Sequence, residues 1–399
     1  MALTSNAYCV SVSNSKMIDK GISHWLRKIR LLNFRNYREV NFEIQNEPVV
    51  LIGKNGTGKT NLMEAISLLA PGRGLRRANT DDFSHKDLNN PKQNQRKWAL
   101  YVDLITNDKC WQIGTGISEE SNRRIVKINQ ETETQEMLAK ICSISWLTPQ
   151  MDGLFLDSPK TRRLFIDRLA ISFDPAHSGR LLRFLKSYRE RNRMLANEVK
   201  DPIWYSLNET QLAETGVAIM ATRNALIEDI NRTVQNMQTE FPKFSAQLVG
   251  GGTELLNRIP ASEIEDIIKQ NAKKNREANN SSIMGPHTAD LLVTHSEKKQ
   301  FANEASTGEQ KALLITFILA HAHLQSSCLG VDCTRLVRNI ERQKLILECD
   351  YSTPYLVMLQ GTYSCNYSCR DHTSRHFTRH TSTATTAVTC VHSLQLYLS

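Results

Sequence analysis

The first part of the chain shows the two-residue alternation of apolar and polar positions that is typical of β-strands. Residues 26–34 read as an edge-type strand, and residues 38–44 alternate charged and apolar side chains. We therefore expect a hairpin that leads into the short apolar run of residues 49–52. The strand pattern continues, which predicts a sheet that also includes residues 97–105, 111–114 and 124–129.

From about residue 158 the apolar residues recur at the three- and four-residue intervals of amphipathic helices, and they keep this period to about residue 230. This pattern predicts a long helical insertion. Residues 271–282 are polar and are expected to form a mobile connection, after which residues 281–293 return to a strand-like pattern around a Gly-Pro break. The order of strands, helices and strands predicts an α/β fold.

A glycine-rich motif joins residues 49–52 to the helix-like residues 61–66. A buried strand, a tight turn and a helix N-terminus make a P-loop, whose glycines let backbone N–H groups close on a polyphosphate. Lys59 is expected to reach the β and γ oxygens, and Thr60 to offer its hydroxyl to Mg²⁺. The predicted nucleotide-binding residues are Gly53, Lys54, Asn55, Gly56, Thr57, Gly58, Lys59 and Thr60.

A second distinctive motif, residues 306–311, precedes the apolar run of residues 312–320. It begins with Ser306 and contains Gly308. A short hydroxyl residue and a glycine at a helix N-terminus can form an anion site. On spacing alone, this segment reads as a capped core helix.

The composition and net charge of the chain indicate an anionic partner. The 399 residues are enough for two or three domains, and 40% apolar with 23% charged residues is ordinary soluble composition. The net charge of +9 favours a nucleic acid over a membrane surface because a nucleotide motif is present, although a mildly basic surface without a partner is the alternative. No apolar signal segment or membrane-length run is found, so we expect a cytoplasmic protein.

The helical insertion carries a run of basic residues with Glu190 as the acidic residue among them. Such a run is read equally well as a solvated helix face and as a surface for the phosphate backbone of a nucleic acid. The run comprises Arg180, Arg183, Lys186, Arg189, Arg191 and Arg193.

Taken in order, the motifs resemble the SMC-like ABC-type ATPases of chromosome maintenance, and within them the RecF family of bacterial recombination-repair proteins. The resemblance covers about residues 25–324 and rests on separated segments that occur in the family's order. Thr288 stands where we would expect an arginine in the family, which leaves the role of that position open. The segments are residues 32–37, 53–65, 72–76, 158–167, 285–287 and 306–311.

The resemblance implies a composite ATP site between two heads. Lys59 would hold the phosphates, Thr60 and Gln150 would serve Mg²⁺ and the attacking water, and Ser306 with Gly308 would cap the γ-phosphate of a partner subunit. It also places Arg35 and Asn36 of the hairpin near the nucleotide. ATP would then drive homodimerisation, and the closed dimer would bind double-stranded or gapped DNA and help to load a recombinase, together with RecO and RecR.

The resemblance also implies a division of the chain into an ATPase head and a mostly helical arm. Residues 24–150 would be the first half of the head, with the P-loop, and residues 151–280 would be the arm. Residues 281–325 would be the returning half of the head with the signature motif. Residues 326–399 form an atypical tail that does not follow the family.

The sequence departs from the family after residue 324. An ABC-type ATPase needs a strand that ends in Asp-Glu, for Mg²⁺ and the attacking water. The nearest segment, residues 344–350, ends in Glu-Cys-Asp, so whether the chain hydrolyses ATP is left open. Cys365, Cys369, His372 and His376 lack the separation of a zinc finger.

Our preferred hypothesis for the tail is a shift of the reading frame near residues 324–330. It is motivated by the joint loss of the motif and of acidic residues, since residues 352–399 contain one acidic residue, Asp371. Translation of the two other frames of the gene is the test. If neither frame gives an apolar strand ending in Asp-Glu, the tail is genuine and the hypothesis is wrong.

Two other functions are consistent with the residues. One is a different P-loop enzyme, such as a small-molecule kinase, which would be indifferent to mutation of Ser306. The other is a non-hydrolysing DNA-binding scaffold for which ATP is only a switch. Lys59→Ala should abolish DNA binding by a scaffold that ATP switches, and it should leave DNA binding unchanged if the nucleotide site is inactive.

Overall fold

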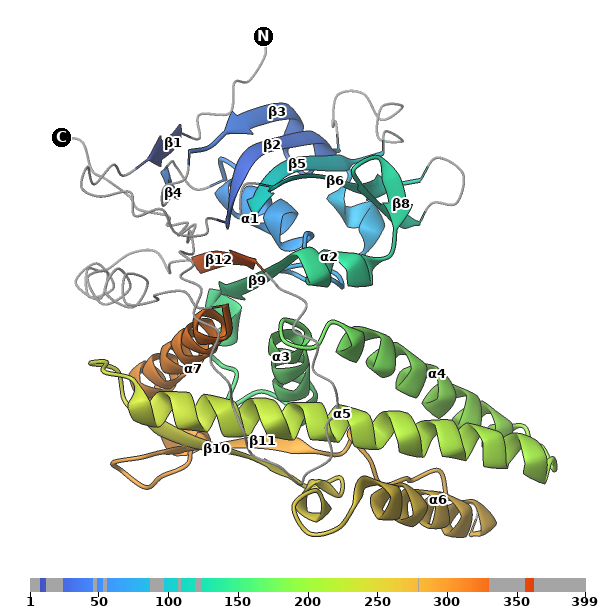
Figure 1. Ribbon diagram of the computed structural model, residues 1–399. Helices are drawn as coiled ribbons and strands as arrows, with labels where there is room; N and C mark the ends of the chain where they lie inside the picture. Colours follow the sequence, from blue (N-terminus) through green and yellow to red (C-terminus); the bar gives the residue numbers. More distant parts are fainter. Residues whose placement is uncertain are drawn as a thin grey trace. The chain divides into compact units, whose positions relative to one another are not determined.

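The structure is a computed structural model, which describes residues 8–11, 24–45, 49–52, 56–86, 97–106, 109–118, 123–278, 280–329 and 356–361. The chain divides into two compact units (Figure 1). Unit 1 comprises residues 1–149 and 325–399, and unit 2 comprises residues 150–324.

Unit 1 contains a six-stranded antiparallel sheet with the strand order β3-β2-β5-β6-β7-β8. The predicted hairpin is confirmed: β2 and β3 pair antiparallel up to the Phe34–Tyr37 pair that closes the turn. The strands are β2 (His24–Phe34), β3 (Tyr37–Glu43), β5 (Ala99–Thr106), β6 (Lys109–Ile117), β7 (Arg124–Ile128) and β8 (Glu131–Glu133).

The sheet of unit 1 has a buried face because its strands alternate apolar and polar side chains. In β2, Ile29 and Leu31 are fully buried, whereas Arg30 and Leu32 between and beside them are exposed. One end of this face is closed by aromatic rings: Phe34 stacks on the ring of Phe83 with centroids 5.5 Å apart, and Trp98 meets both edge-on. These rings fix the position of the 3₁₀ turn η1 (Thr80–Phe83) against the sheet.

Two shorter strand pairs complete the described β-structure of unit 1. Strand β4 (Val49–Ile52), which precedes the glycine-rich motif, pairs antiparallel with β1 (Tyr8–Ser11). Strand β9 (Cys142–Leu147) pairs antiparallel with β12 (Leu356–Gly361) from the tail. The helices of this unit are α1 (Lys59–Ser67) and α2 (Gln135–Ile141).

Unit 2 is mostly helical, which confirms the change of period near residue 158. Besides its helices, unit 2 contains a two-stranded antiparallel sheet of β10 (Phe244–Val249) and β11 (Asp290–His295). The helices are α3 (Pro159–Ile171), α4 (Ala176–Ala196), α5 (Pro202–Asn236), α6 (Ala261–Glu277) and the first part of α7 (Thr307–Leu329). The 3₁₀ turn η3 (Pro149–Met151) precedes α3 at the boundary of the two units, and η4 (Thr253–Leu255) and η5 (Ala302–Glu304) lie between later elements.

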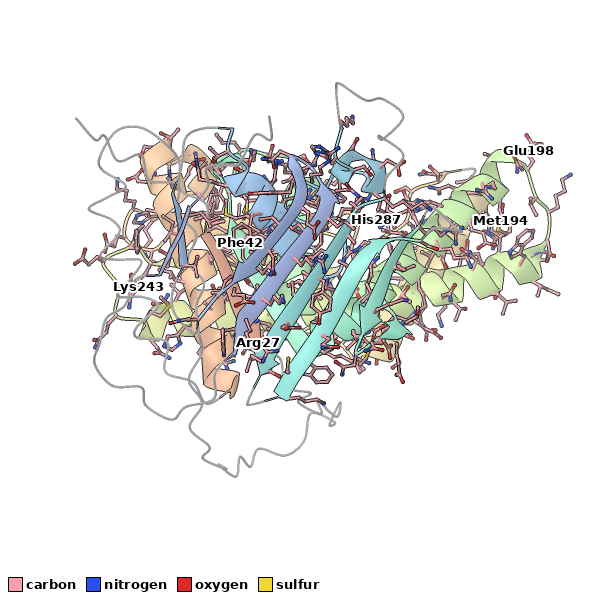
Figure 2. All side chains as sticks on the ribbon, turned by 90° about the horizontal axis from the view of Figure 1, so that it is seen from above. Arg27, Phe42, Met194, Glu198, Lys243 and His287 are labelled. Carbon is pink, nitrogen blue, oxygen red and sulfur yellow. The ribbon has the colours of Figure 1, made fainter. Side chains whose placement is uncertain are left out.

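Helices α4 and α5 form a long antiparallel hairpin. Asp201 caps α5 by accepting hydrogen bonds from the backbone N–H groups of Ile203 and Trp204, and Pro202 fits the first helical position because it needs no N–H there. Figure 2 places Met194 and Glu198 at one end of this hairpin and Lys243 beyond the other end of α5. We refer to this α4–α5 hairpin as the arm.

The arm is tied to α6 by a buried arginine. Arg191, one of the basic residues of the predicted run, is fully buried and donates to Glu209 of α5 and to the carbonyl groups of Ala272 and Ser281. Arg191 therefore lies in the core of the arm, and neither sequence reading, solvated face or phosphate contact, holds for this residue. The others in the run that are exposed are Arg183, Lys186, Arg189 and Arg193.

Two local predictions for unit 2 are wrong. Residues 271–277 are not a connection but the last two turns of α6, because Ile264, Ile268 and Ala272 form a buried stripe at four-residue spacing. The strand expected over residues 281–293 begins only at Asp290. The residues before it form a turn, in which the hydroxyl of Thr288 donates to the carbonyl of Gly285 at 2.9 Å.

Candidate nucleotide-binding site

The turn of the β2–β3 hairpin holds the glycine-rich motif in unit 1. Asn36 donates to the carbonyl of Thr57 at 3.2 Å, and the hydroxyl of Tyr37 donates to the carbonyl of Gly58 at 3.1 Å. Asn61, on the first turn of α1, donates back to Asn36 at 2.8 Å. The end of the motif is thus fixed before a ligand arrives, which is what a phosphate cradle requires.

Gly58 has to be glycine for two independent reasons. Its φ is +103°, in the left-handed region that side chains rarely adopt. A Cβ atom there would lie 2.4 Å from the side-chain nitrogen of Asn36 and 2.8 Å from the hydroxyl of Tyr37. The absence of a side chain therefore lets the hairpin turn close on the N-terminus of α1.

Lys59 and Thr60 follow at the first positions of α1. Lys59 is buried, and this burial lowers the pKa of its ammonium group. The first-turn N–H groups of the helix and this ammonium make the N-terminus of α1 electropositive. Gly56 and Thr57 belong to the described part of the motif, whereas Gly53, Lys54 and Asn55 lie outside the described residues.

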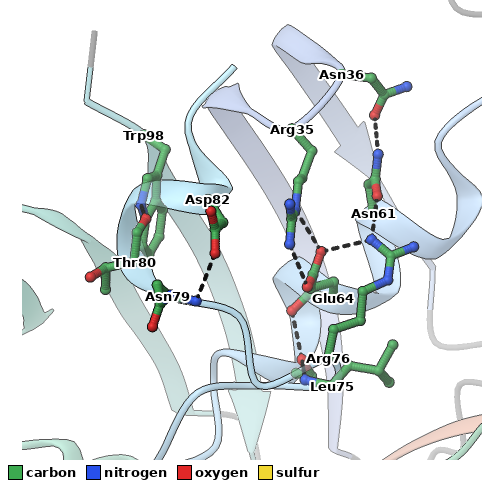
Figure 3. Close-up of polar contacts among 11 residues, drawn as sticks. Arg35, Asn36, Asn61, Glu64, Leu75, Arg76, Asn79, Thr80, Asp82 and Trp98 are labelled. Atoms are coloured by element: carbon green, nitrogen blue, oxygen red, sulfur yellow. Dashed lines mark hydrogen bonds and ion pairs between the residues drawn. The ribbon is translucent and has the colours of Figure 1, made fainter. Parts of the chain in front are cut away.

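A buried carboxylate stands in the middle of α1 (Figure 3). Glu64 has no exposed surface and accepts two hydrogen bonds from Arg35, at 2.9 and 3.0 Å, and one from Arg76 at 3.1 Å. Arg76 also donates to Asn61 at 2.9 Å. The side chain of Arg35 is thus engaged with α1 itself, and two arginines from different segments hold the helix through one acid.

The opposite end of α1 is held by Arg124 of β7. This side chain donates to the carbonyl of Leu68, to the carbonyl of Gly72 at 2.6 Å and to the hydroxyl of Thr115 at 3.0 Å. Burial lowers the pKa of Arg124 to about 10, so the group is still a cation at neutral pH. A cation is favourable at a helix C-terminus because it meets the negative end of the helix dipole.

The signature motif lies in unit 2 at the start of α7. The backbone N–H and the hydroxyl of Ser306 each donate to Glu309 at 2.9 Å, and the N–H of Glu309 lies 3.4 Å from the Ser306 hydroxyl oxygen. This reciprocal pattern is a capping box. Gly308 is exposed, and a Cβ atom there would meet nothing within 4 Å, so the first turn of α7 presents an open face.

Gln150 lies in η3, also in unit 2, two residues before Asp152. Asp152 forms an ion pair with Lys311 of α7 at 3.5 Å. Burial raises the pKa of Asp152, and Lys311 opposes this shift. The structure therefore connects the segment of Gln150 to the signature helix within one unit, while Lys59 and Thr60 belong to unit 1.

Several residues of these sites were not predicted from the sequence. Tyr37, Glu64, Arg76 and Arg124 lie in segments for which the sequence predicts structure or a family resemblance, but it assigned no role to their side chains. The one sequence signal for such a role is at Glu64, where an acid occupies a core position of α1. Within the described ranges, no cluster of three or more His, Cys, Asp or Glu side chains could hold a metal ion.

The tail predictions fall almost entirely outside the described residues. This applies to residues 344–350 and to Cys365, Cys369, His372 and His376. The described parts of the tail are residues 326–329, which end α7, and β12, which runs antiparallel to β9. Among the helices that the structure describes, none combines the length and the apolar character needed to cross a membrane.

Comparison with known protein families matches residues 25–332 to the RecF/RecN/SMC N-terminal domain. The chain is 38% identical over 323 residues to the DNA replication and repair protein RecF of Mesorhizobium japonicum, a match that covers 79% of this chain and 84% of the relative. It is also 38% identical over 314 residues to the RecF of Brucella abortus, covering 77% of this chain and 80% of the relative.

Solved structures share the fold. One is described as the recombination mediator protein RecF-ATP in the RecFOR pathway; it aligns with a TM-score of 0.67 at 18% identity, over 84% of this chain and 91% of that chain. A second, of the same protein as RecF-ATPrS, aligns with a TM-score of 0.66 at 19% identity, over 77% and 84%. The predicted α/β, ABC-type architecture is thereby confirmed.

Proposed function

Because the chain belongs to the RecF family of DNA replication and repair proteins, we propose that it binds ATP with Mg²⁺ and dimerises on the nucleotide in order to bind DNA. The observation that carries this proposal is the clamped N-terminus of α1, where the carbonyl groups of Thr57 and Gly58 accept hydrogen bonds from Asn36 and Tyr37 and the buried Lys59 follows. Because the chain belongs to this family, the proposed function is favoured over that of an unrelated P-loop kinase.

The two units supply different halves of a nucleotide site. In unit 1, Lys59 and the first N–H groups of α1 would hold the phosphates, and Thr60 would bind Mg²⁺. In unit 2, Ser306 and Gly308 would contact the γ-phosphate of a nucleotide held by a second copy, and Gln150 would orient Mg²⁺ and water. Nucleotide phosphates supply negative charge that only two such faces together can neutralise, so the nucleotide favours the dimer.

The arm supports the DNA-binding part of the proposal. Four of its basic side chains, Arg183, Lys186, Arg189 and Arg193, are exposed along α4, and cations spaced along one helix suit the phosphate backbone of double-stranded or gapped DNA. We propose residues 24–150 and 281–325 as the ATPase head and residues 151–280 as the arm domain that contains this hairpin. RecO and RecR are the proposed partners in loading recombinase in the cytoplasm.

A second candidate function is an ATP-switched scaffold that does not turn over. It is favoured by the absence of an Asp-Glu pair in the sequence after residue 324. Under this proposal ATP binds and closes the dimer, and hydrolysis is slow.

The test is molecular mass in solution, measured by light scattering with and without ATP and Mg²⁺. We expect a monomer to become a dimer, and we expect Lys59→Ala and Ser306→Arg each to abolish the change while leaving the melting temperature within a few degrees. A wild-type chain of unchanged mass would contradict the proposal. Turnover measured alongside DNA binding separates the two candidates, since the scaffold predicts ATP-dependent binding without DNA-stimulated hydrolysis.

A further inference from the structure

A rigid turn between β11 and η5 presents a lysine to the signature helix. The backbone N–H groups of Glu297 and Lys298 both donate to the imidazole nitrogen Nδ1 of His295 at 3.3 Å, and His295 itself is buried. The N–H of His295 donates to the carbonyl of Gln300 at 2.9 Å, and the N–H of Lys299 donates to the carbonyl of His295 at 3.0 Å. The turn is therefore fixed by its own residues, independently of any ligand.

From this turn, the ammonium of Lys298 pairs with Glu309, the acid of the capping box. Glu309 therefore has two kinds of partner, Lys298 on one oxygen and Ser306 on the other. Lys298, together with the hydrogen bonds from Ser306, lowers the pKa of the Glu309 carboxyl to about 2. Glu309 is consequently an anion at neutral pH.

An anion at this position conflicts with the proposed task of Ser306. The hydroxyl that would donate to a terminal phosphate is already 2.9 Å from a carboxylate oxygen. A phosphate in hydrogen-bond distance of that hydroxyl would therefore lie close to a like charge, and like charges repel at this range even when solvent screens them. Without a cation next to Glu309, nothing would offset the repulsion between this carboxylate and the phosphate.

We propose that Lys298 is a positioning residue for Ser306, one that neutralises Glu309 so that the serine can turn its hydroxyl towards the phosphate of a nucleotide held by a second copy. This inference rests on the proposed function. Lys298 acts through Glu309 and need not touch the nucleotide. In the absence of a second copy, the Lys298–Glu309–Ser306 arrangement keeps the hydroxyl on the carboxylate.

The test is a double-mutant cycle on the full chain. The dimer dissociation constant is measured by analytical ultracentrifugation with ATPγS and Mg²⁺. Lys298→Met leaves the carboxylate unpaired beside the phosphate and is expected to weaken the dimer about tenfold. Glu309→Gln removes the charge that has to be neutralised, so Lys298→Met added to Glu309→Gln should cause less than about a twofold change.

Three controls separate this role from a structural one. Lys299→Met removes an equal charge from the same turn and should leave the dimer nearly unchanged. Lys298→Arg keeps the cation and should retain most of the affinity. The melting temperature of the Lys298→Met chain should stay near that of the wild type, since the pair is partly exposed, with 53% of the Lys298 side chain accessible.

The outcomes are distinguishable. If the wild type dimerises and Ser306→Arg does not, but Lys298→Met behaves like the wild type, the positioning role is wrong and the proposed function stands. The same conclusion follows if Glu309→Gln fails to rescue Lys298→Met. If the wild type stays monomeric with ATPγS and Mg²⁺, the proposed function and this inference are both overturned.

Discussion

The imidazole of His321 lies 2.9 Å from the hydroxyl of Ser172 and joins α7 to the end of α3. The ring is fully buried, with its Nε2 atom also 3.2 Å from the carbonyl of Leu169 and Phe173 packed against it edge-on. Burial lowers the pKa of His321 to about 4. The signature helix is thus fastened to α3 by a histidine that is neutral at pH 7.

This relationship predicts acid-sensitive stability. The unfolded chain takes up a proton at His321 below about pH 6.5, whereas the folded chain resists it down to about pH 4. The neutral His321 therefore contributes to the free energy of unfolding above pH 6.5. This contribution, on the order of 2–3 kcal/mol, is lost as the pH falls towards 4. Urea unfolding at pH 7 and 4.5 should show it.

His321→Gln is the comparison for that measurement. It removes the titrating group, so the difference in unfolding free energy between the two pH values should shrink. His287, whose pKa burial lowers to about 4 as well, remains in both proteins and leaves a residual slope in the same direction. An unchanged pH dependence in the His321→Gln chain would show that His321 does not titrate in this window.

The buried acid of α1 should matter for stability and for nucleotide binding together. Glu64→Gln leaves Arg35 and Arg76 without their anion, and breaking a buried ion pair costs about 3–5 kcal/mol. We expect a matching loss of unfolding free energy and weaker binding of a fluorescent ATP analogue. Glu39→Gln breaks an exposed pair with Arg30 in the same unit and should cost less than about 1 kcal/mol.

Two glycines of the phosphate loop should differ in their tolerance of alanine. Both have positive φ, +85° at Gly56 and +103° at Gly58, so each substitution carries backbone strain of about 1–2 kcal/mol. Only at Gly58 does the new Cβ also collide with Asn36 and Tyr37. Gly58→Ala should therefore abolish ATP binding in a titration, whereas Gly56→Ala should weaken it by less; equal effects would argue against the hairpin clamp.

Loss of the cap on α1 should be visible without any ligand. Arg124→Met removes the donor to the carbonyl groups of Leu68 and Gly72 and to Thr115. Leaving the buried Leu68 carbonyl and the buried Thr115 hydroxyl without this donor costs about 2–4 kcal/mol in total, whereas the exposed Gly72 carbonyl can bond to water. Denaturant unfolding should report this loss, and Arg123→Met, an exposed neighbour, should change the stability by less than about 0.5 kcal/mol.

The sequence alone identified the elements whose signal is local. The β2–β3 hairpin, the strand-loop-helix of the P-loop and the capped start of α7 each depend on residues within a few positions of one another, so periodicity and glycine placement were sufficient. The helical arm followed from its apolar spacing for the same reason. The order of these motifs was enough to indicate the family.

The tertiary structure decided which polar groups meet across long separations. Packing of distant segments brings Arg191 to Glu209 and away from solvent. It also brings Arg35 to the buried Glu64, and Lys298 to Glu309. The last turns of α6 show the same limit: the residues are polar, yet they are helical because a stripe of three apolar side chains is buried on the arm. A one-dimensional pattern records which side chains can be buried, and only packing decides which partner each one meets.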